Sequence, residues 1–393
     1  MAPPADALEA MSSVVSSAIS LITQFEAVIE PFHDRKTTNP APAPTQETLQ
    51  QQQQTTSVDP FSLAHDSTNL IRAHATKISL FIINEPFTPT AITKVLRELV
   101  AGPLPALTAA VQLCDAQTYT KVIQRDIAWH CSRVFKELRE LLQKVPKDGK
   151  ILVGDKKNAS AGAASGKGSI AATGVLWSVC DDLMALAKRG FAGNLVLKVE
   201  QFRDTLKDTI EELKEWGEET GDDEDIGEDD DGEDGVKQIT EGVASTHMDA
   251  QDMLDDLMGS QDYIPRDDPD KIRGRLESCL KRLRLVTLLY SAMIKRRLKP
   301  LPRLPPSTAV PDGLPTVAAR LDEIIPLLAK IPERFGDLAI AFYGLDPGEI
   351  DKLMDQCFFD AYAASELLMK AWDGEKDAFT EWALKFQVEI KKS

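Results

Sequence analysis

An acidic run at residues 218–235, reading EETGDDEDIGEDDDGEDG, constrains the fold of this chain more than any other segment. Twelve of its eighteen residues are Asp or Glu, and none is Lys or Arg. Such a run cannot bury apolar surface and its charges repel one another, so we expect a solvated, disordered connector between separately folded units. The alternative is an interaction segment that contacts a basic partner surface. Without these twelve charges the net charge of −17 falls to −5.

The rest of the chain is patterned for long α-helices. Apolar residues recur at three- and four-residue steps, as in the first expected helix with Leu8, Met11 and Val15. No segment alternates with period two, so we expect essentially no sheet. The pattern predicts helices over about residues 5–30, 59–84, 88–113 with a break at 102–103, 116–145, 169–189, 194–216, 248–258, 267–299, 316–343, 347–372 and 377–391.

Prolines and capping residues indicate several helix ends. Asp59 before Pro60 is a typical helix start, with Asp as the cap and Pro in the first turn. Pro31 is expected to end the first helix. Pro326 and Pro332 are expected to kink or split the helix that contains them, because proline removes a backbone hydrogen bond.

Together these features predict an all-α protein made of two bundles of long antiparallel helices. The first bundle is expected over residues 1–217, with a disordered loop at about 35–58. An acidic disordered linker at 218–247 then leads to a second bundle over residues 248–393. Long helices with short connectors bury their apolar stripes best in such bundles.

Composition indicates an intracellular protein. The five cysteines are scattered singly, which is no disulfide framework. The uncharged stretch Leu99 to Cys114 is shorter than the roughly 20 residues that a membrane span needs. A negative chain also repels phosphates, so we expect no direct nucleic-acid binding. The expected location is cytoplasmic and nuclear, without membrane insertion.

No catalytic or cofactor-binding arrangement stands out. The segment Gly162 to Ser169 resembles a phosphate-binding loop, but its glycines are one residue too close and Gly168 replaces the required Ser or Thr. None of the five histidines has metal-ligand spacing to another His or Cys. We therefore expect no metal, no cofactor and no enzymatic activity. The tryptophans, Trp177 among them, are expected in the core.

A basic helix follows the acidic run. Ten Lys or Arg lie between Lys271 and Lys299, against Glu277 alone. This helix has three interpretations: an ordinary positive outer face, a surface that pairs with the acidic run, or a contact for an acidic partner or import receptor. The candidate partner-binding residues are Lys281, Arg282, Arg284, Lys295, Arg296, Arg297 and Lys299, with Asp222, Asp223, Glu224, Asp225, Asp229, Asp230 and Asp231.

Two short cyclin-docking patterns, a basic residue followed two positions later by Leu, lie in the same helix. In the first the leucine is Leu283, which falls on the apolar stripe and is expected to be buried. In the second it is Leu298, at the helix end, where we expect it to be accessible.

Two segments carry a family resemblance: the one reading GVLWSVCDDL from Gly174 to Leu183, and the one reading FGDLAIAFY from Phe335 to Tyr343. With the helix order from about residue 60 onward, they resemble the cyclin-D-binding protein (GCIP) family. That resemblance implies talin- or vinculin-like helical bundles and negative control of proliferation or transcription. The implied partners are cyclin-like or helix–loop–helix-type regulators.

The leading functional hypothesis is therefore a non-enzymatic interaction protein whose helical bundles contact partner helices. A cytoskeletal adaptor of the talin or vinculin type is the alternative, because the same helical architecture serves both. An enzyme built into a bundle core is the third.

Overall fold

The computed structural model describes residues 4–33, 58–152, 168–218, 263–302, 304 and 316–392, and in this part of the chain every regular element is a helix. The all-α prediction is confirmed. In chain order the elements are α1 (Ala5–His33), α3 (Pro60–Ile83), α4 (Pro89–Ala101), α5 (Pro103–Leu113), α6 (Ala116–Tyr119), α7 (Lys121–Gln143), α8 (Ser169–Glu218), α10 (Ile272–Met293), the π-helical turn η2 (Ile294–Leu298), α11 (Val317–Tyr343), α12 (Pro347–Leu367) and α13 (Ala378–Glu389).

Most predicted helix ends are confirmed, but the prolines act less strongly than expected. Asp59 caps α3 by accepting a hydrogen bond of 2.9 Å from the backbone N–H of Ser62. By contrast, α1 continues through Pro31 to His33, and α11 contains both Pro326 and Pro332. Buried side chains on either side of a proline can outweigh the one backbone hydrogen bond that it removes.

Two helix breaks depend on positive backbone φ angles. Thr120, at φ 77°, divides one predicted helix into α6 and α7. Gly190, at φ 67°, kinks α8 where a stop and restart were predicted. The Asn194 side chain closes this kink, because its Nδ2 donates to the carbonyls of Leu186 at 2.8 Å and Gly190 at 2.7 Å. The kink thus keeps its backbone acceptors satisfied.

The described helices form two compact units. The first unit comprises Met1–Lys198 and Leu298–Glu323, and the second comprises Val199–Arg297 and Ile324–Ser393. The division therefore falls inside α8 rather than at residue 217, and a segment after η2 returns to the first unit. The long helices α8 and α11 each contribute residues to both units. The acidic run, from which the boundary was predicted, gives no sign of this.

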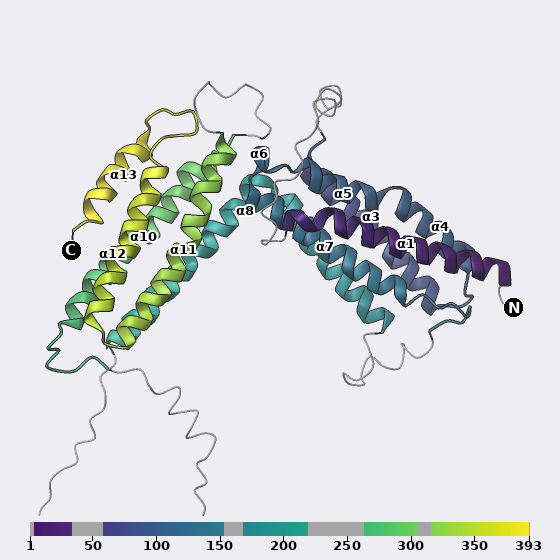
Figure 1. Ribbon diagram of the computed structural model, residues 1–393, viewed down its shortest axis with the longest axis horizontal. Helices are drawn as coiled ribbons and strands as arrows, with labels where there is room; N and C mark the ends of the chain where they lie inside the picture. Colours follow the sequence, from purple (N-terminus) through teal and green to yellow (C-terminus); the bar gives the residue numbers. More distant parts are fainter. Residues whose placement is uncertain are drawn as a thin grey trace, which may run out of the picture. The chain divides into compact units, whose positions relative to one another are not determined.

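In the first unit, α1 packs along α7 and α4, and α3 packs along α5 and α4 (Figure 1). Their shared core is aliphatic, with fully buried Ile22, Ile71, Leu96 and Leu138. Asp322, from the start of α11, accepts a 2.9 Å hydrogen bond from the backbone N–H of Lys121 at the beginning of α7.

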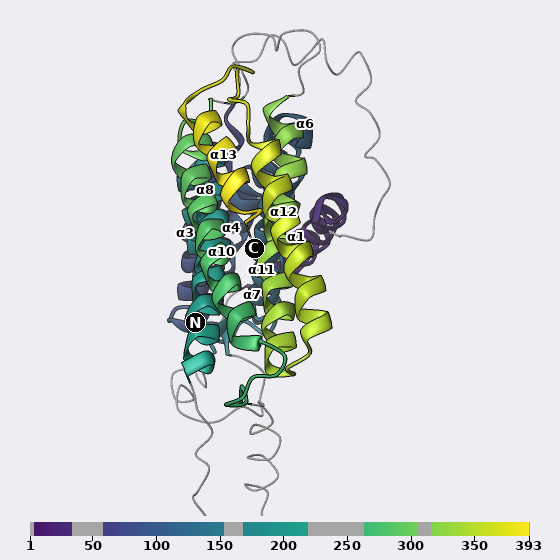
Figure 2. The same cartoon turned by 90° about the vertical axis from the view of Figure 1, so that its left-hand side faces the viewer.

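In the second unit, α10 lies beside α12 and α13 (Figure 2). Its core is richer in aromatic residues, and Phe335 and Phe358 meet edge to face. The fully buried Tyr290 of α10 donates a 2.7 Å hydrogen bond to the carbonyl of Leu328 in α11. Buried tyrosines normally find such a partner.

Several sequence predictions fall outside the described residues. These are the loop at 35–58 except Val58, the acidic run from Glu219 onward and the helix at 248–258. Two described helices, α1 and α8, are long and apolar enough to cross a membrane, by length and composition alone. Both are partly buried against neighbouring helices, and core helices of soluble proteins pass the same test.

Candidate partner-binding surfaces

The ten cations around α10 and η2 divide into an inward and an outward set. Four of them contact other parts of the second unit through their side chains: Arg273, Arg275, Arg282 and Arg297. The other six, Lys271, Lys281, Arg284, Lys295, Arg296 and Lys299, are exposed and have no carboxylate oxygen within 4 Å among the described residues. Of these ten cations in the described part of the chain, only this outward set is both exposed and without such contacts.

Arg297 is the clearest correction to the predicted partner-binding set, because its side chain is 1% exposed. Its guanidinium forms two hydrogen bonds with the Asp377 carboxylate, at 2.7 and 2.9 Å, and a third to the carbonyl of Leu368 at 2.9 Å. It also lies 4.3 Å from the centre of the Phe379 ring. Arg297 therefore anchors α13 instead of reaching a partner.

The electrostatic consequence appears at Asp377. Its hydrogen bonds from Arg297 hold the pKa of the Asp377 carboxyl well below its usual range. One sequence signal could have placed Arg297 inward, since it lies seven residues after Tyr290, which itself lies seven after the buried Leu283. Two turns of helix return a residue to the same face.

Arg282 is also committed inside the protein. Its guanidinium lies 3.7 Å from the centre of the Phe358 ring, and its Nε donates a 3.0 Å hydrogen bond to the carbonyl of Ile390. Burial lowers the pKa of Arg282. Of the predicted basic residues, Lys281, Arg284, Lys295, Arg296 and Lys299 thus remain as surface candidates.

Three of these cations and Leu288 form what we call the outer basic stripe: Lys281, Arg284, Leu288 and Lys295. Steps of three, four and seven residues bring them to one face of α10 and the start of η2. Leu288 is 53% exposed between Arg284 and Lys295. The predicted acidic partners of this face, Asp222, Asp223, Glu224, Asp225, Asp229, Asp230 and Asp231, lie outside the described residues.

Neither cyclin-docking pattern is accessible. Leu283 is fully buried, as expected, but Leu298 is fully buried as well, which corrects the prediction that the second pattern is exposed. The π-helical turn carries Arg297 and Leu298 into the core together. A docking leucine must enter a pocket on its partner, so these two patterns cannot act in the folded protein.

Trp177 was expected in the core, but it is 37% exposed on α8. Its indole Nε1 donates a 3.0 Å hydrogen bond to Thr76 Oγ1 of α3. The Arg72 guanidinium lies 5.4 Å from the Trp177 ring centre, and Arg72 Nε is 3.2 Å from Asp181 Oδ1. Leu176, not Trp177, continues the stripe towards buried Cys180 and was the signal for this orientation.

Trp129 forms a second arrangement of the same kind. It is 48% exposed on α7, and the Arg133 guanidinium lies 4.9 Å from its ring centre. Arg133 in turn pairs with Asp182 of α8 at 3.3 Å. The neighbouring residues Asp181 and Asp182 therefore each hold an arginine beside an exposed tryptophan, one towards α3 and the other towards α7.

The two tryptophans differ in how firmly they are held. The ring of Trp177 is fixed by a hydrogen bond across two helices, between residues 101 positions apart in sequence. The structure gives Trp129 a contact with its helix neighbour His130 and the Arg133 contact. Trp177 is thus the more rigid of the two surface aromatics.

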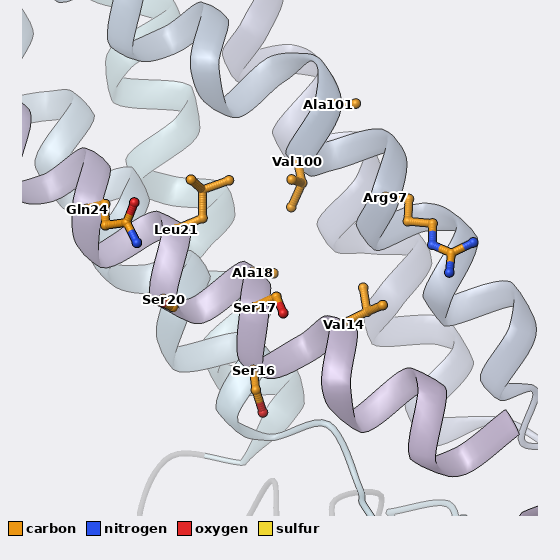
Figure 3. A pocket seen from close by; sticks show the side chains of 10 residues that line it. All are labelled: Val14, Ser16, Ser17, Ala18, Ser20, Leu21, Gln24, Arg97, Val100 and Ala101. Carbon is orange, nitrogen blue, oxygen red and sulfur yellow. The ribbon is translucent and has the colours of Figure 1, made fainter. Parts of the chain in front are cut away.

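An open groove of about 810 Å³ lies between α1 and α4 in the first unit (Figure 3). Val14 and Leu21 of α1 face Val100 of α4 across it, and the groove is edged by serines of α1. Arg97 is the one charged side chain in its lining. The rest of the lining is uncharged, a mixture of apolar and small polar side chains that suits a contact surface.

The cysteines and the possible metal ligands show no reactive arrangement in the described part of the chain. All five cysteines are buried and unbridged, and burial raises the pKa of Cys180 to about 12. Such thiols are poor nucleophiles. No group of three His, Cys, Asp or Glu among the described residues is arranged to hold a metal ion. Of the loop that resembles a phosphate site, only Gly168 and Ser169 are described.

Comparison with known proteins finds a family match over part of the chain. Residues 64–219 match the family described as Grap2 and cyclin-D-interacting, N-terminal, which confirms the resemblance seen in the sequence. Over 328 residues, 83% of each chain, the protein is 23% identical to an uncharacterised protein of Schizosaccharomyces pombe. No solved structure matches the chain. The family match contains Trp129 and Trp177, whereas the outer basic stripe lies beyond it.

Proposed function

We propose that this protein is a non-enzymatic regulator that acts through protein contacts. The premise is that residues 64–219 are an N-terminal domain of the Grap2 and cyclin-D-interacting (GCIP) family. The expected role of the protein is in cell-cycle or transcriptional control, in the cytoplasm and nucleus. The family description names cyclin D, so a D-type cyclin is the first partner to test. The proposal includes neither nucleic-acid binding nor membrane insertion.

The observation that carries this proposal is the exposed, rigidly held Trp177 inside the family-matched region. Tryptophan and arginine are enriched among the residues that contribute most to protein–protein binding. A large aromatic ring that stays exposed gives up stabilisation of the fold, because full burial of a large apolar side chain contributes about 1.5–3 kcal/mol to folding. The exposed ring of Trp177, held by Thr76 and Arg72, is therefore the contact that we propose for a partner.

The contacts of Trp177 also suit binding physically. Its Nε1–H is already satisfied by Thr76, so covering the ring strands no donor. The hydrogen bond and the Arg72 contact hold the ring in one orientation. A side chain that is ordered before binding loses less conformational entropy on binding, and this loss is about 0.5–1.5 kcal/mol for a mobile side chain.

A cyclin partner would have to bind without the two docking patterns, because Leu283 and Leu298 are buried. The helical surface around Trp177 offers a different mode, in which a partner helix or groove receives the ring. Leu80 and Ile170, each about half exposed, carry further apolar surface on the same two helices. The talin- or vinculin-like alternative rests on helical architecture alone, which many functions share.

The test is the affinity of purified D-type cyclin for the parent protein and for Trp177→Ala. We expect at least about a tenfold loss, because truncating a central aromatic costs about 2 kcal/mol or more. Trp129→Ala is the matched control, since it removes a second exposed tryptophan that has its own arginine contact. Its affinity should change by less than about threefold.

Three outcomes would contradict the proposal. Equal losses for Trp177→Ala and Trp129→Ala would show that neither ring is a specific contact. An unchanged affinity in Trp177→Ala, with the folded state intact by circular dichroism, would place the cyclin contact elsewhere. Absence of any cyclin binding by the parent would remove the proposed partner.

A further inference from the structure

We infer that the groove between α1 and α4 is a docking site for a short amphipathic helix of another protein. That helix carries apolar residues along one face and a carboxylate at one end. The groove lies within the first unit, and Trp177, the proposed cyclin contact, is not among the residues that line it. The inference is therefore independent of the proposed function.

The first argument is that the surface on both sides of the groove contains almost no charge. Residues 10–25 of α1 and residues 99–114, which run from the end of α4 through α5, are two stretches of 16 residues without Asp, Glu, Lys or Arg. In the whole chain 27% of the residues are charged. Charged residues are depleted at the centres of protein–protein interfaces, so this composition is typical of such a centre.

The α1 stretch is uncharged although much of it faces solvent. Seven of its 16 residues are exposed and four are buried, whereas in 99–114 four are exposed and eight are buried. By composition α1 is apolar enough to cross a membrane, yet only 22% of its apolar window is buried. The core of the first unit explains the composition of 99–114 but not that of the outer face of α1.

The second argument is the shape of the groove (Figure 3). Val14 and Leu21 of α1 and Val100 of α4 form its apolar surface, and small side chains of α1 edge it. Small side chains between two helices let a third helix approach closely, with its ridge of side chains in the groove. From Val14 to Gln24 the lining extends about 15 Å along α1 at the helical rise, so it fits an occupant helix of about three turns.

The third argument is the position of the one charge in the lining. Arg97 lies at the end of the groove near Val14, and Gln24 lies at the opposite end (Figure 3). A carboxylate on the occupant helix would meet the Arg97 guanidinium, and apolar residues one and two turns away would meet Val100 and Leu21. Because Arg97 is exposed, this pair sets the direction of the helix more than its affinity.

The walls of the groove favour a helix over an extended peptide. An extended segment needs partners for its backbone N–H and C=O groups, and it usually finds them at the edge of a sheet. Both walls are helices, and the described part of the chain contains no strand. A helical occupant satisfies its own backbone and needs only side-chain contacts.

The experiment measures the binding of a fluorescently labelled synthetic helical peptide to the full chain by fluorescence anisotropy. The peptide has about 15 residues, with leucines three or four positions apart on one face and one glutamate beyond them at one end. A second peptide carries lysine in place of that glutamate. We expect saturable binding of the glutamate peptide by the parent chain, and binding of the lysine peptide at least about threefold more weakly.

Ser17→Trp tests the groove by filling it with a large side chain. Ser17 lines the groove and is exposed, so the core of the unit is untouched. We expect the variant to bind the glutamate peptide at least about tenfold more weakly. Thr23→Trp is the matched control, because Thr23 is exposed on the same helix but does not line the groove. Its affinity should stay within about threefold of the parent value, and melting curves establish that both variants are folded.

Arg97→Glu tests the charge separately from the shape. It should bind the glutamate peptide at least about fivefold more weakly than the parent does, and the lysine peptide more tightly, because both charges of the pair are then exchanged. Lys94→Glu is the matched control, an exposed lysine one turn away on α4 and outside the lining. It should change either affinity by less than about threefold at 0.15 M salt, where the Debye length is about 8 Å.

Several outcomes would overturn the inference. No saturable peptide binding by the parent, or equal losses in Ser17→Trp and Thr23→Trp, would show that the groove is not the site. Equal effects of Arg97→Glu on the two peptides would remove the carboxylate. Displacement of the peptide by oleate at a lower concentration than by unlabelled peptide would replace the helix with a lipid. A parent dimer in sedimentation that becomes a monomer in Ser17→Trp would replace it with a second copy of this chain.

Discussion

The same group of three residue types, an arginine, an aromatic ring and an aspartate, occurs at Arg72 in the first unit and at Arg297 in the second. Arg72 lies near Trp177 and Asp181, and its side chain is 39% exposed. Arg297 lies on Phe379 and beside Asp377, and its side chain is 1% exposed. The chemistry is alike, but the surroundings are opposite.

The difference lies in the additional hydrogen bonds and in the geometry. Arg297 makes two well-directed bonds to its carboxylate and further bonds to backbone carbonyls of Leu368 and Met369. Arg72 Nε lies 3.2 Å from Asp181 Oδ1, but the two groups are not oriented to form a hydrogen bond. Exposed ion pairs contribute about 0–1 kcal/mol, whereas breaking a buried pair costs several kcal/mol. Burial thus assigns the Arg297 site to stability, whereas the Arg72 site stays exposed, as the proposed contact of Trp177 with a partner requires.

The largest expected effect is that of Arg297→Ala. It removes a fully buried side chain, leaves the carbonyl of Leu368 without its Arg297 donor, and leaves the carbonyl of Met369 with Thr380 Oγ1 alone. We expect a loss of about 3–5 kcal/mol in the free energy of unfolding of the second unit. Hydrogen exchange in α12 and α13, followed by mass spectrometry, measures it.

Arg72→Ala is the matched control for that variant. It should cost less than about 1 kcal/mol and should change exchange in the first unit alone. Comparable losses in the two variants would break the distinction between a stability site and a binding site.

A smaller effect is expected from pH, and it should separate the two units. Burial lowers the pKa of His74 and His130, both in the first unit, so the folded state favours their neutral forms. Below the unfolded pKa of about 6.5, the unfolded chain binds protons that the folded unit does not. The stability of the first unit should therefore fall between about pH 6.5 and 5, by at most about 1.4 kcal/mol per pH unit for each histidine.

The described residues of the second unit contain no histidine, so its exchange rates, corrected for intrinsic pH dependence, should be nearly constant over that range. In the second unit the acid-sensitive groups include Asp377, whose pKa is lowered by Arg297, and Asp351, whose pKa is lowered by Arg275. The stabilisation that they contribute is present above about pH 4 and is lost only as pH falls further. Simultaneous weakening of both units near pH 6 would contradict this assignment.

The smallest expected change in stability is that of Thr76→Val, which keeps the shape of the side chain but removes the acceptor for Trp177. We expect a loss of about 0.5–1 kcal/mol in the first unit, because the half-exposed indole can turn to water instead. Partner affinity should nevertheless fall a few fold, since the ring is no longer held in place. Thr23→Val in α1, where Thr23 bonds only within its own helix, should leave affinity unchanged.

Local chemistry made much of the fold predictable. The caps at Asp59 and Asp377, the break before Pro103 and the apolar stripes of α7 and α10 follow from spacing within a few residues. The predictions were less accurate where packing overrode a local rule. Pro332 remains inside α11 because Ile331 and Phe335 beside it are fully buried. Thr120 adopts a positive φ that its residue type does not announce.

By itself, the sequence determined the all-α class, most helix positions, the family resemblance and the concentration of charge around residues 218–235 and 271–299. Only the tertiary structure decided which members of those patterns face solvent. Arg297 is buried because Asp377, 80 residues away, meets it, and Trp177 is held at the surface by Thr76, 101 residues away. Helical periodicity determines the face on which a side chain lies. Whether that face is covered depends on another helix, whose position follows from packing across the whole unit.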